Sequence, residues 1–165
     1  MNRRELILLL INASIGRPLA AGAQEKTVPV IGFLGGATLG TNAPNVAAFH
    51  RGLSETGFTE GQNVVIDYRW AERHYDRLPV LAADLVARKV DLIAAFDIAS
   101  ARAAKSKTRS IPIVFVVGGD PVAAGLVTNI ARPSGNLTGV SFVSTELMPK
   151  RLQLLSELVP HQTSL

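Results

Sequence analysis

Short apolar runs alternate with amphipathic stretches along most of this chain. The runs occupy residues 28–34, 62–70, 90–96, 111–117 and 139–143. Between and after them, apolar residues recur at helical spacing in stretches that begin near Pro44, at Asp76, after Asp97 and near Met148 or Pro149. This alternation of strand-like and helix-like segments predicts an α/β fold, a doubly wound parallel sheet of about five strands with right-handed crossovers.

Local residue chemistry predicts several element boundaries. Pro44 suits the first turn of a helix and Gly57 suits its end. Asp76 is predicted to be the N-cap of the next helix. The alternating pattern of 62–70 indicates an exposed or an edge strand. The last helix, which ends before Pro160, is predicted to direct inward its apolar residues Leu152, Leu155 and Leu158 or Val159.

The segment from Ile111 to Gly125 links the fold to a site. Ile111–Val117 is apolar without alternation, which is typical of a strand buried on both faces of a parallel sheet. It ends in the turn-forming residues Gly118-Gly119-Asp120-Pro121, and a small-residue helical stretch is predicted to follow. Ligands of open α/β sheets bind outside the carboxyl ends of the strands. The turn therefore marks the expected functional edge, which the loops after the first and third runs share.

Two carboxylates lie at this edge, and each has two interpretations. In the functional interpretation, the Asp120 carboxylate faces a ligand or orders the turn that binds one. In the structural interpretation, it forms an Asx turn that caps the amides of the following residues. Asp97 has the same two interpretations. In the structural one, it is the N-cap of the following helix. Gly118 and Gly119 permit close approach of the backbone to a ligand.

The sequence lacks the common catalytic and cofactor motifs. A dinucleotide-binding G-x-G-x-x-G fails because Gly35, Ala37 and Gly40 occupy its three glycine positions. A phosphate loop fails because Thr41 and Asn42 stand where Lys and Ser/Thr are needed. There is no cysteine, and the three histidines lie far apart without metal-ligand spacing. We therefore predict no catalytic residues, no metal and no cofactor.

The N-terminus is predicted to be a secretory signal peptide over residues 1–23. Arg3-Arg4 precede an apolar stretch, and Ala21-Gly22-Ala23 supplies a cleavage pattern, in the order typical of exported proteins. The alternative, a membrane anchor, needs about 20 apolar residues, and this stretch is shorter. The chain carries a net charge of +4, and removal of residues 1–23 takes away three arginines and one glutamate, which leaves +2. The basic residues form no clustered stripe, so we expect no nucleic-acid partner.

The sequence resembles one protein family over almost its whole length. The matching segments include Val30–Leu34, Phe49–Leu53, Glu60–Val64, Ile66–Ala71, Tyr75–Pro79, Ala82–Val86, Ile111–Phe115, Gly118–Val122 and Lys150–Leu152. In this order they resemble the extracytoplasmic substrate-binding proteins of ABC uptake systems, in the branch related to aromatic amino acid binding proteins.

The resemblance implies a flavodoxin-like sheet that forms one lobe of a type I periplasmic-binding-protein fold. Members of the family have two α/β lobes that close on a small ligand and present it to a permease in the inner membrane. For this chain, the resemblance implies an amino acid as a possible ligand. It therefore implies a periplasmic, non-enzymatic protein. Carried onto this sequence, the ligand-binding residues are expected in three loops, namely Gly35, Gly36, Ala37 and Thr38, then Asp97, Ile98, Ala99 and Ser100, and last Gly118, Gly119, Asp120 and Pro121.

The sequence departs from the family pattern in two ways. Asp97 and Ile98 stand where the family usually has small residues. The family is also about twice as long, so we expect residues 24–160 to form the N-terminal lobe, 161–165 a truncated tail, and the second lobe to be absent. An exposed cleft or hinge face is then expected to weaken ligand binding and to favour self-association.

Two other functions stay open at this stage. One is a small α/β enzyme that uses Asp120 or Asp97 as a base, although no nucleophile or metal set accompanies either. The other is the effector-binding domain of a regulator with the same two-lobed fold, against which the export signal counts.

Overall fold

The structure is a computed structural model of the chain, and it describes residues 28–133, 135–142 and 147–158. Five parallel strands form one sheet in the order β2-β1-β3-β4-β5. The strands are β1 (Val30–Gly35), β2 (Val65–Trp70), β3 (Leu92–Ala95), β4 (Ile113–Val117) and β5 (Leu137–Ser141). The helices are α2 (Leu39–Glu55), α3 (Leu78–Ala87), α4 (Ile98–Lys107) and α5 (Met148–Leu158), and a 3-10 turn, η1 (Tyr75–Arg77), leads into α3. The predicted parallel α/β fold is confirmed, with β2 at one edge.

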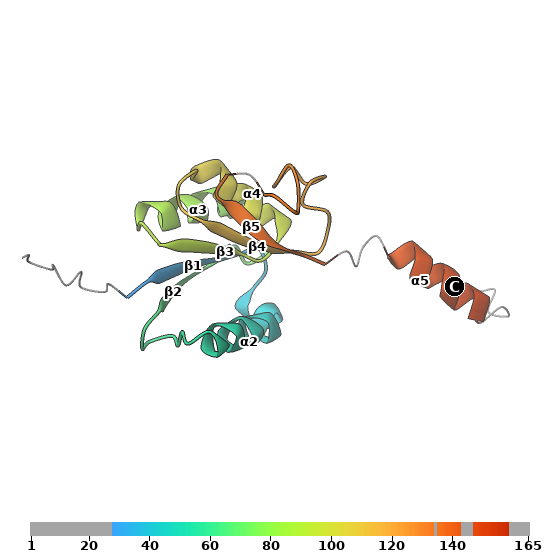
Figure 1. Ribbon diagram of the computed structural model, residues 1–165, viewed down its shortest axis with the longest axis horizontal. Helices are drawn as coiled ribbons and strands as arrows, with labels where there is room; N and C mark the ends of the chain where they lie inside the picture. Colours follow the sequence, from blue (N-terminus) through green and yellow to red (C-terminus); the bar gives the residue numbers. More distant parts are fainter. Residues whose placement is uncertain (1–27, 134, 143–146, 159–165) are drawn as a thin grey trace, which may run out of the picture.

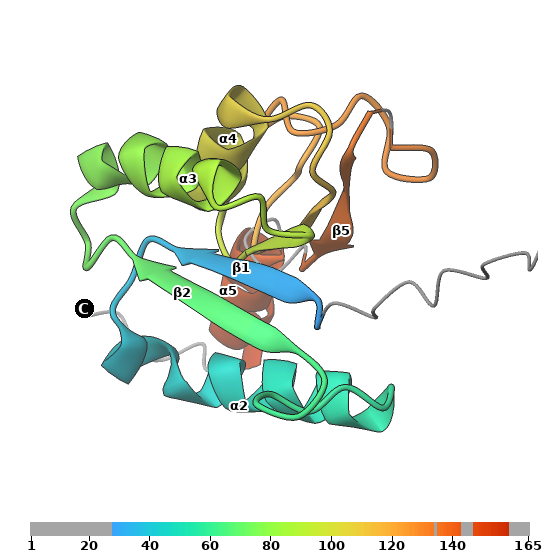
Figure 2. The same cartoon turned by 90° about the vertical axis from the view of Figure 1, so that its left-hand side faces the viewer.

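The two faces of the sheet are covered unequally. Helices α3 and α4 lie on one face and α2 on the other (Figures 1 and 2). The face under α3 and α4 holds the larger core, which includes Leu85, Ile93 and Ile113. The face under α2 holds a small cluster of buried residues, namely Ile31, Val64 and Ala94. Most of the hydrophobic stabilisation therefore comes from the α3–α4 side.

Strand β4 shows this inequality residue by residue. Ile113, Phe115 and Val117 are buried and belong to the larger core, whereas Val114 and Val116 are half-buried. Because successive side chains of a strand alternate between faces, the half-buried valines lie on the α2 side. The prediction that this strand is buried on both faces is therefore wrong for the α2 face.

The N-terminus of α2 differs from the prediction, and its C-terminus agrees. The helix begins at Leu39 rather than near Pro44, because the side chain of Thr38 caps the backbone N–H of Thr41. Pro44 lies inside the helix. The helix ends at Glu55, and Gly57, whose φ is +86°, follows the C-cap residue, while Phe58 N–H donates to the carbonyl of Leu53 at 2.9 Å. This Schellman geometry requires a left-handed residue, which explains the glycine.

Four other predictions need correction. Asp76 lies within η1 and caps no helix, since α3 begins at Leu78 without a side-chain cap. After β4, residues 121–125 form turns rather than a helix, because Gly125, at φ +68°, stops the single turn. Strand β5 begins two residues before the predicted start, and residue 143 lies outside the described residues. The predicted inward leucines of α5 are exposed, because no described element covers them, and Val159 is not described.

An ion-pair network joins the edge strand β2 to α3. Arg69 donates to the carboxylates of Asp67 and Asp84, and Arg88 also donates to Asp84 at 3.1 Å. The guanidinium of Arg69, with that of Arg88, lowers the pKa of Asp84. The network therefore ties the free edge of the sheet to the helix layer.

Acid is expected to weaken this network. A carboxylate with a lowered folded-state pKa stabilises the protein above its unfolded pKa of about 3.9, and that stabilisation is lost as the pH falls through the lower folded value. In thermal unfolding experiments between pH 6 and pH 3, the melting temperature of the Arg69→Met variant should fall less on acidification than that of the wild type. Equal losses would show that the network does not contribute to acid sensitivity.

Candidate functional site

The loops that follow β1, β3 and β4 meet at the carboxyl edge of the sheet. Gly36 N–H, in the first loop, donates to Asp97 Oδ2, in the second loop, at 2.7 Å. One shared hollow is lined by Ile98 and Ala99, which begin α4 directly after the second loop, and by Gly118 and Gly119 of the third loop. The structure therefore brings the three predicted loops together.

This hollow, the edge hollow, has a volume of about 490 Å³. It is lined by Tyr75, Phe96, Asp97, Ile98, Ala99, Gly118 and Gly119. Five of these were predicted from the sequence, whereas Tyr75 and Phe96 were not. Asp97 is the single charged residue of the lining, so the walls are mainly apolar and aromatic.

Asp97 organises the edge from inside. Its Oδ1 accepts the Ser100 N–H at 2.7 Å, and its Oδ2 accepts the Ser100 Oγ–H at 2.8 Å besides the Gly36 N–H. The predicted N-cap role of Asp97 is thus confirmed, and the cap extends to a second loop. Ser100 is fully buried beneath this arrangement.

The remaining predicted residues lie outside the lining of the edge hollow. Gly35 packs against the ring of Trp70 and Gly36 against that of Tyr75, where a Cβ would come within 2.6 Å and 2.4 Å of the ring carbons. Thr38 caps α2, and Ala37 is half-buried. Pro121 is fully buried.

Asp120 forms the predicted Asx turn. Its Oδ1 accepts the Val122 N–H at 2.7 Å, and its backbone carbonyl accepts the Ala124 N–H. The structural interpretation of Asp120 is therefore confirmed. No group of three potential metal ligands occurs among the residues that the structure describes.

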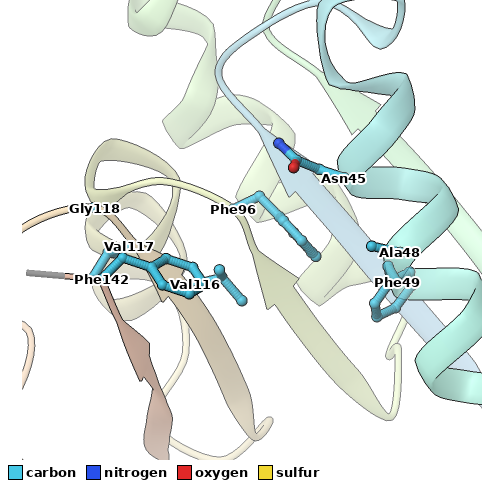
Figure 3. Close-up of a pocket in the computed structure, with 8 residues that line it drawn as sticks. All are labelled: Asn45, Ala48, Phe49, Phe96, Val116, Val117, Gly118 and Phe142. Atoms are coloured by element: carbon cyan, nitrogen blue, oxygen red, sulfur yellow. The ribbon is translucent and has the colours of Figure 1, made fainter. Parts of the chain in front are cut away.

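A second hollow, the sheet-face hollow, lies between α2 and strands β4 and β5 (Figure 3). Its volume is about 450 Å³, and its lining is uncharged: Asn45, Ala48, Phe49, Phe96, Val116, Val117, Gly118 and Phe142. Phe96 and Gly118 line both hollows. The sheet-face hollow extends down the α2 face of the sheet, away from the glycine turn that the sequence indicated.

The comparisons with known proteins agree with this architecture. The family model for ABC transporter substrate binding proteins matches residues 28–165. The chain belongs to this family. It is 36% identical over 113 residues to a tyrosine-binding protein of Clostridioides difficile (strain R20291), covering 68% of this chain and 32% of that protein.

Solved substrate-binding proteins share the fold. The ligand-free, open structure of a substrate-binding protein with adhesive properties from Clostridium difficile is 33% identical, with a TM-score of 0.68 over 78% of this chain and 44% of that one. A conserved domain protein of Vibrio cholerae is 27% identical, with a TM-score of 0.74 over 81% and 45%. An ABC domain from Streptococcus pneumonia in complex with L-Trp is 29% identical, with a TM-score of 0.63 over 68% and 38%. The chain thus spans about a third of the curated relative and less than half of each solved structure.

Membership of this family favours a substrate-binding role over the enzyme alternative. Proteins that bind and present substrates are not enzymes, and both candidate bases, Asp97 and Asp120, hold backbone amides of their own chain. Family members are typically extracytoplasmic. Within the described ranges, no helix has the length and apolarity needed to cross a bilayer.

Tyr75 and Phe96 were missed because their positions depend on tertiary structure. Phe96 follows β3 and stacks on Phe33 with ring centroids 4.3 Å apart, which directs it toward both hollows. Tyr75 begins η1 and is 54% exposed beside Gly36. Phe96 is the last residue of the apolar run 90–96, and an aromatic residue at the end of such a run was the available signal. This signal does not distinguish a residue that lines a site from one that packs in the core.

Another polar cluster lies near the edge strand, away from both linings. Tyr68 OH and His50 Nε2 are 2.6 Å apart, and His50 Nε2 is 3.5 Å from Glu60 Oε2. Burial and the Glu60 carboxylate raise the pKa of Tyr68 to about 12. These contacts join α2 to β2, so the cluster is a structural link between layers.

Proposed function

We propose that this chain provides one lobe of an extracytoplasmic substrate-binding protein that presents a small ligand to an ABC permease. The observation that carries the proposal is the edge hollow, a mainly apolar space at the carboxyl edge of the sheet that is lined by Tyr75 and by residues that follow β3 and β4. In open α/β sheets this is the position at which ligands bind. The proposed ligand contacts are the predicted residues that line this hollow, together with Tyr75 and Phe96: Asp97, Ile98, Ala99, Gly118 and Gly119.

The proposed ligand is an amino acid with an aromatic side chain. Tyr75, Phe96 and Ile98 supply ring faces and an aliphatic surface that suit a flat apolar group. Asp97 is the one anionic group of the lining, and it favours the ligand's ammonium group over its carboxylate. The tyrosine-binding relative and the L-Trp complex support the same ligand class.

We expect weak binding by this lobe. Binding pockets usually enclose most of a small ligand's surface, and the edge hollow contacts it from one side. A second lobe, which the relatives' additional length would supply, completes the cleft in this proposal. The dissociation constant is therefore expected near 1 mM, corresponding to about −4 kcal/mol.

Residues 1–23 are proposed to be the export signal. The small-residue pattern before Gln24 is the proposed cleavage site. Expression in a bacterium, followed by N-terminal sequencing of the periplasmic fraction, should find Gln24 as the first residue. A protein that stays cytoplasmic and begins at Met1 would contradict export.

Amide chemical shifts test the ligand site directly. Titration with L-tryptophan should shift the amides of Ile98, Ala99, Gly118 and Gly119, whereas L-lysine should not. The Tyr75→Ala variant should weaken binding about tenfold, which corresponds to about 1.4 kcal/mol and is typical of a lost aromatic contact. His74→Ala, a change at the adjacent exposed residue, is the matched control. Absence of shifts near saturation, or equal affinity of the Tyr75→Ala variant, would overturn this site.

A further inference from the structure

The segment between β2 and η1 holds two consecutive residues in the left-handed backbone region. The φ angles of Glu72 and Arg73 are +54° and +68°. This region is unfavourable for a residue that carries a Cβ, and a protein keeps such a conformation where the surrounding structure holds the backbone in place. The reason for the strain therefore lies in what the segment contacts.

Backbone hydrogen bonds hold this segment against the loop after β1. Strands β1 and β2 are paired up to Gly35 and Trp70, and in Figure 2 the connection leaves β2 beside the end of β1. Beyond that pair, Ala71 N–H donates to the Gly35 carbonyl at 2.9 Å, and Arg73 N–H donates to the Gly36 carbonyl at 2.7 Å. The left-handed turn thus keeps the chain next to the first loop after the strand pairing has ended.

Two further contacts close the segment around Tyr75. His74 N–H donates to the Ala71 carbonyl at 2.9 Å, so the backbone turns back on itself directly before the tyrosine. Arg77 Nη1 lies 3.7 Å from Glu72 Oε2, and both side chains are exposed. An exposed ion pair of this kind contributes little to stability. The position of Tyr75 is therefore set by the backbone of the segment more than by its side chains.

The Tyr75 ring lies between this segment and the edge hollow. It lines the hollow, and it packs against Gly36. A Cβ placed on Gly36 would lie 2.4 Å from Cε1 of the ring and 3.0 Å from Asp97 Oδ2. Asp97 is held by hydrogen bonds to Ser100, whereas Tyr75 is exposed, so the ring is the neighbour that can move. The shape of the hollow therefore depends on where the segment holds this ring.

Building on the ligand site proposed above, we propose that Tyr75 is the wall of the edge hollow that selects flat aromatic side chains, and that Arg73 is the positioning residue that holds it there. A ring that the backbone already fixes loses little conformational freedom when a second ring stacks on it. A mobile ring would adapt equally well to an aliphatic side chain, and the hollow would not discriminate. Arg73 is exposed and lies outside the lining, so it acts through its backbone conformation.

Proton chemical shifts of the ligand-free protein test the positioning. The ring current of Tyr75 should shift the α-proton resonances of Gly36, and Tyr75→Ala should remove that shift. Arg73→Val should also remove it, because a β-branched residue is strongly disfavoured at this φ. Arg73→Gly should keep the shift and raise the melting temperature by about 2–4 °C, since glycine adopts the conformation without strain. Arg77→Val is the matched control, because Arg77 has a right-handed φ of −76°, and it should keep the shift.

Titration with L-tryptophan and L-leucine tests the selection. The wild type should bind L-tryptophan about tenfold more tightly than L-leucine, and Tyr75→Ala should bring this ratio close to one. Arg73→Val should lower the ratio in the same way, whereas Arg73→Gly and Arg77→Val should keep it. Gly36→Ala displaces the same ring from its other side and should also lower the ratio, which tests the selection where the valine variant fails to fold.

Three results would overturn the proposal. The first is a Gly36 shift that persists in Arg73→Val, which would show that the left-handed backbone does not position the ring. The second is loss of that shift with an unchanged binding ratio, which would show that the position of Tyr75 does not select the ligand. The third is a wild type that binds neither amino acid. Together with loss of the Gly36 shift in Arg73→Val, that result would reject the proposed function and the selection while it supports the positioning of the ring.

Discussion

Replacement of Phe33 by alanine is expected to lower the free energy of unfolding by about 3–5 kcal/mol. Phe33 is fully buried in β1, and its ring lies within 5.5 Å, centroid to centroid, of Phe49, Tyr68, Trp70 and Phe96. It therefore joins α2, the edge strand and the third strand on the less covered face. Alanine would leave a cavity that four rings cannot fill without moving.

Urea unfolding followed by tryptophan fluorescence measures this loss, since Trp70 reports on the same cluster. Phe33→Leu should lose about 1–2 kcal/mol, so it keeps the prediction measurable if the alanine variant is largely unfolded. Phe58→Ala removes a 41% exposed ring and should cost less than about 1 kcal/mol. Similar losses for Phe33→Ala and Phe58→Ala would contradict the role of Phe33 as the centre of this cluster.

The sequence was sufficient for the fold because the central strands are distinct apolar runs and the edge strand β2 has an alternating pattern. The runs around β1, β3 and β4 need no tertiary information to be recognised, and Gly57 marks a helix end through its backbone conformation. The predicted start of α2 was wrong because two local signals for a helix start competed. Thr38 and Pro44 both suit a helix start, and the earlier cap prevails because its side chain satisfies an amide that otherwise lacks a partner.

The site was predictable as loops and less so as side chains. Parallel strands place their carboxyl ends together, which located Gly118 and Asp97 at one edge. Tyr75 reaches that edge because Gly36 leaves room for its ring, and this depends on two segments far apart in the chain. The leucines of α5 were predicted to be buried and are exposed. An amphipathic pattern predicts that one side of a helix is buried, but it does not identify the surface that covers that side.

The second large effect is expected at Asp97. Asp97→Ala removes one carboxylate that accepts hydrogen bonds from Ser100 N–H, Ser100 Oγ–H and Gly36 N–H. Loss of an N-cap alone costs about 1–2 kcal/mol, and the link to Gly36 adds a charge-assisted bond between two loops. We expect a total loss of about 3 kcal/mol in urea unfolding, with the amide of Gly36 exchanging faster with solvent.

Asp97→Asn separates the two functions of this carboxylate. Asparagine is a good N-cap, so its oxygen can still accept the Ser100 N–H, while its NH₂ group cannot accept the Gly36 N–H. This variant should therefore retain the stability of α4 and lose protection at Gly36, with an intermediate cost of about 1–2 kcal/mol. Asp120→Ala is the comparison at the same edge. Among the described residues, the Asp120 side chain accepts from one local amide, Val122 N–H, so its loss should cost less than about 1 kcal/mol. If Asp97→Ala and Asp120→Ala were equally mild, Asp97 would be an ordinary helix cap rather than the group that holds the loops together.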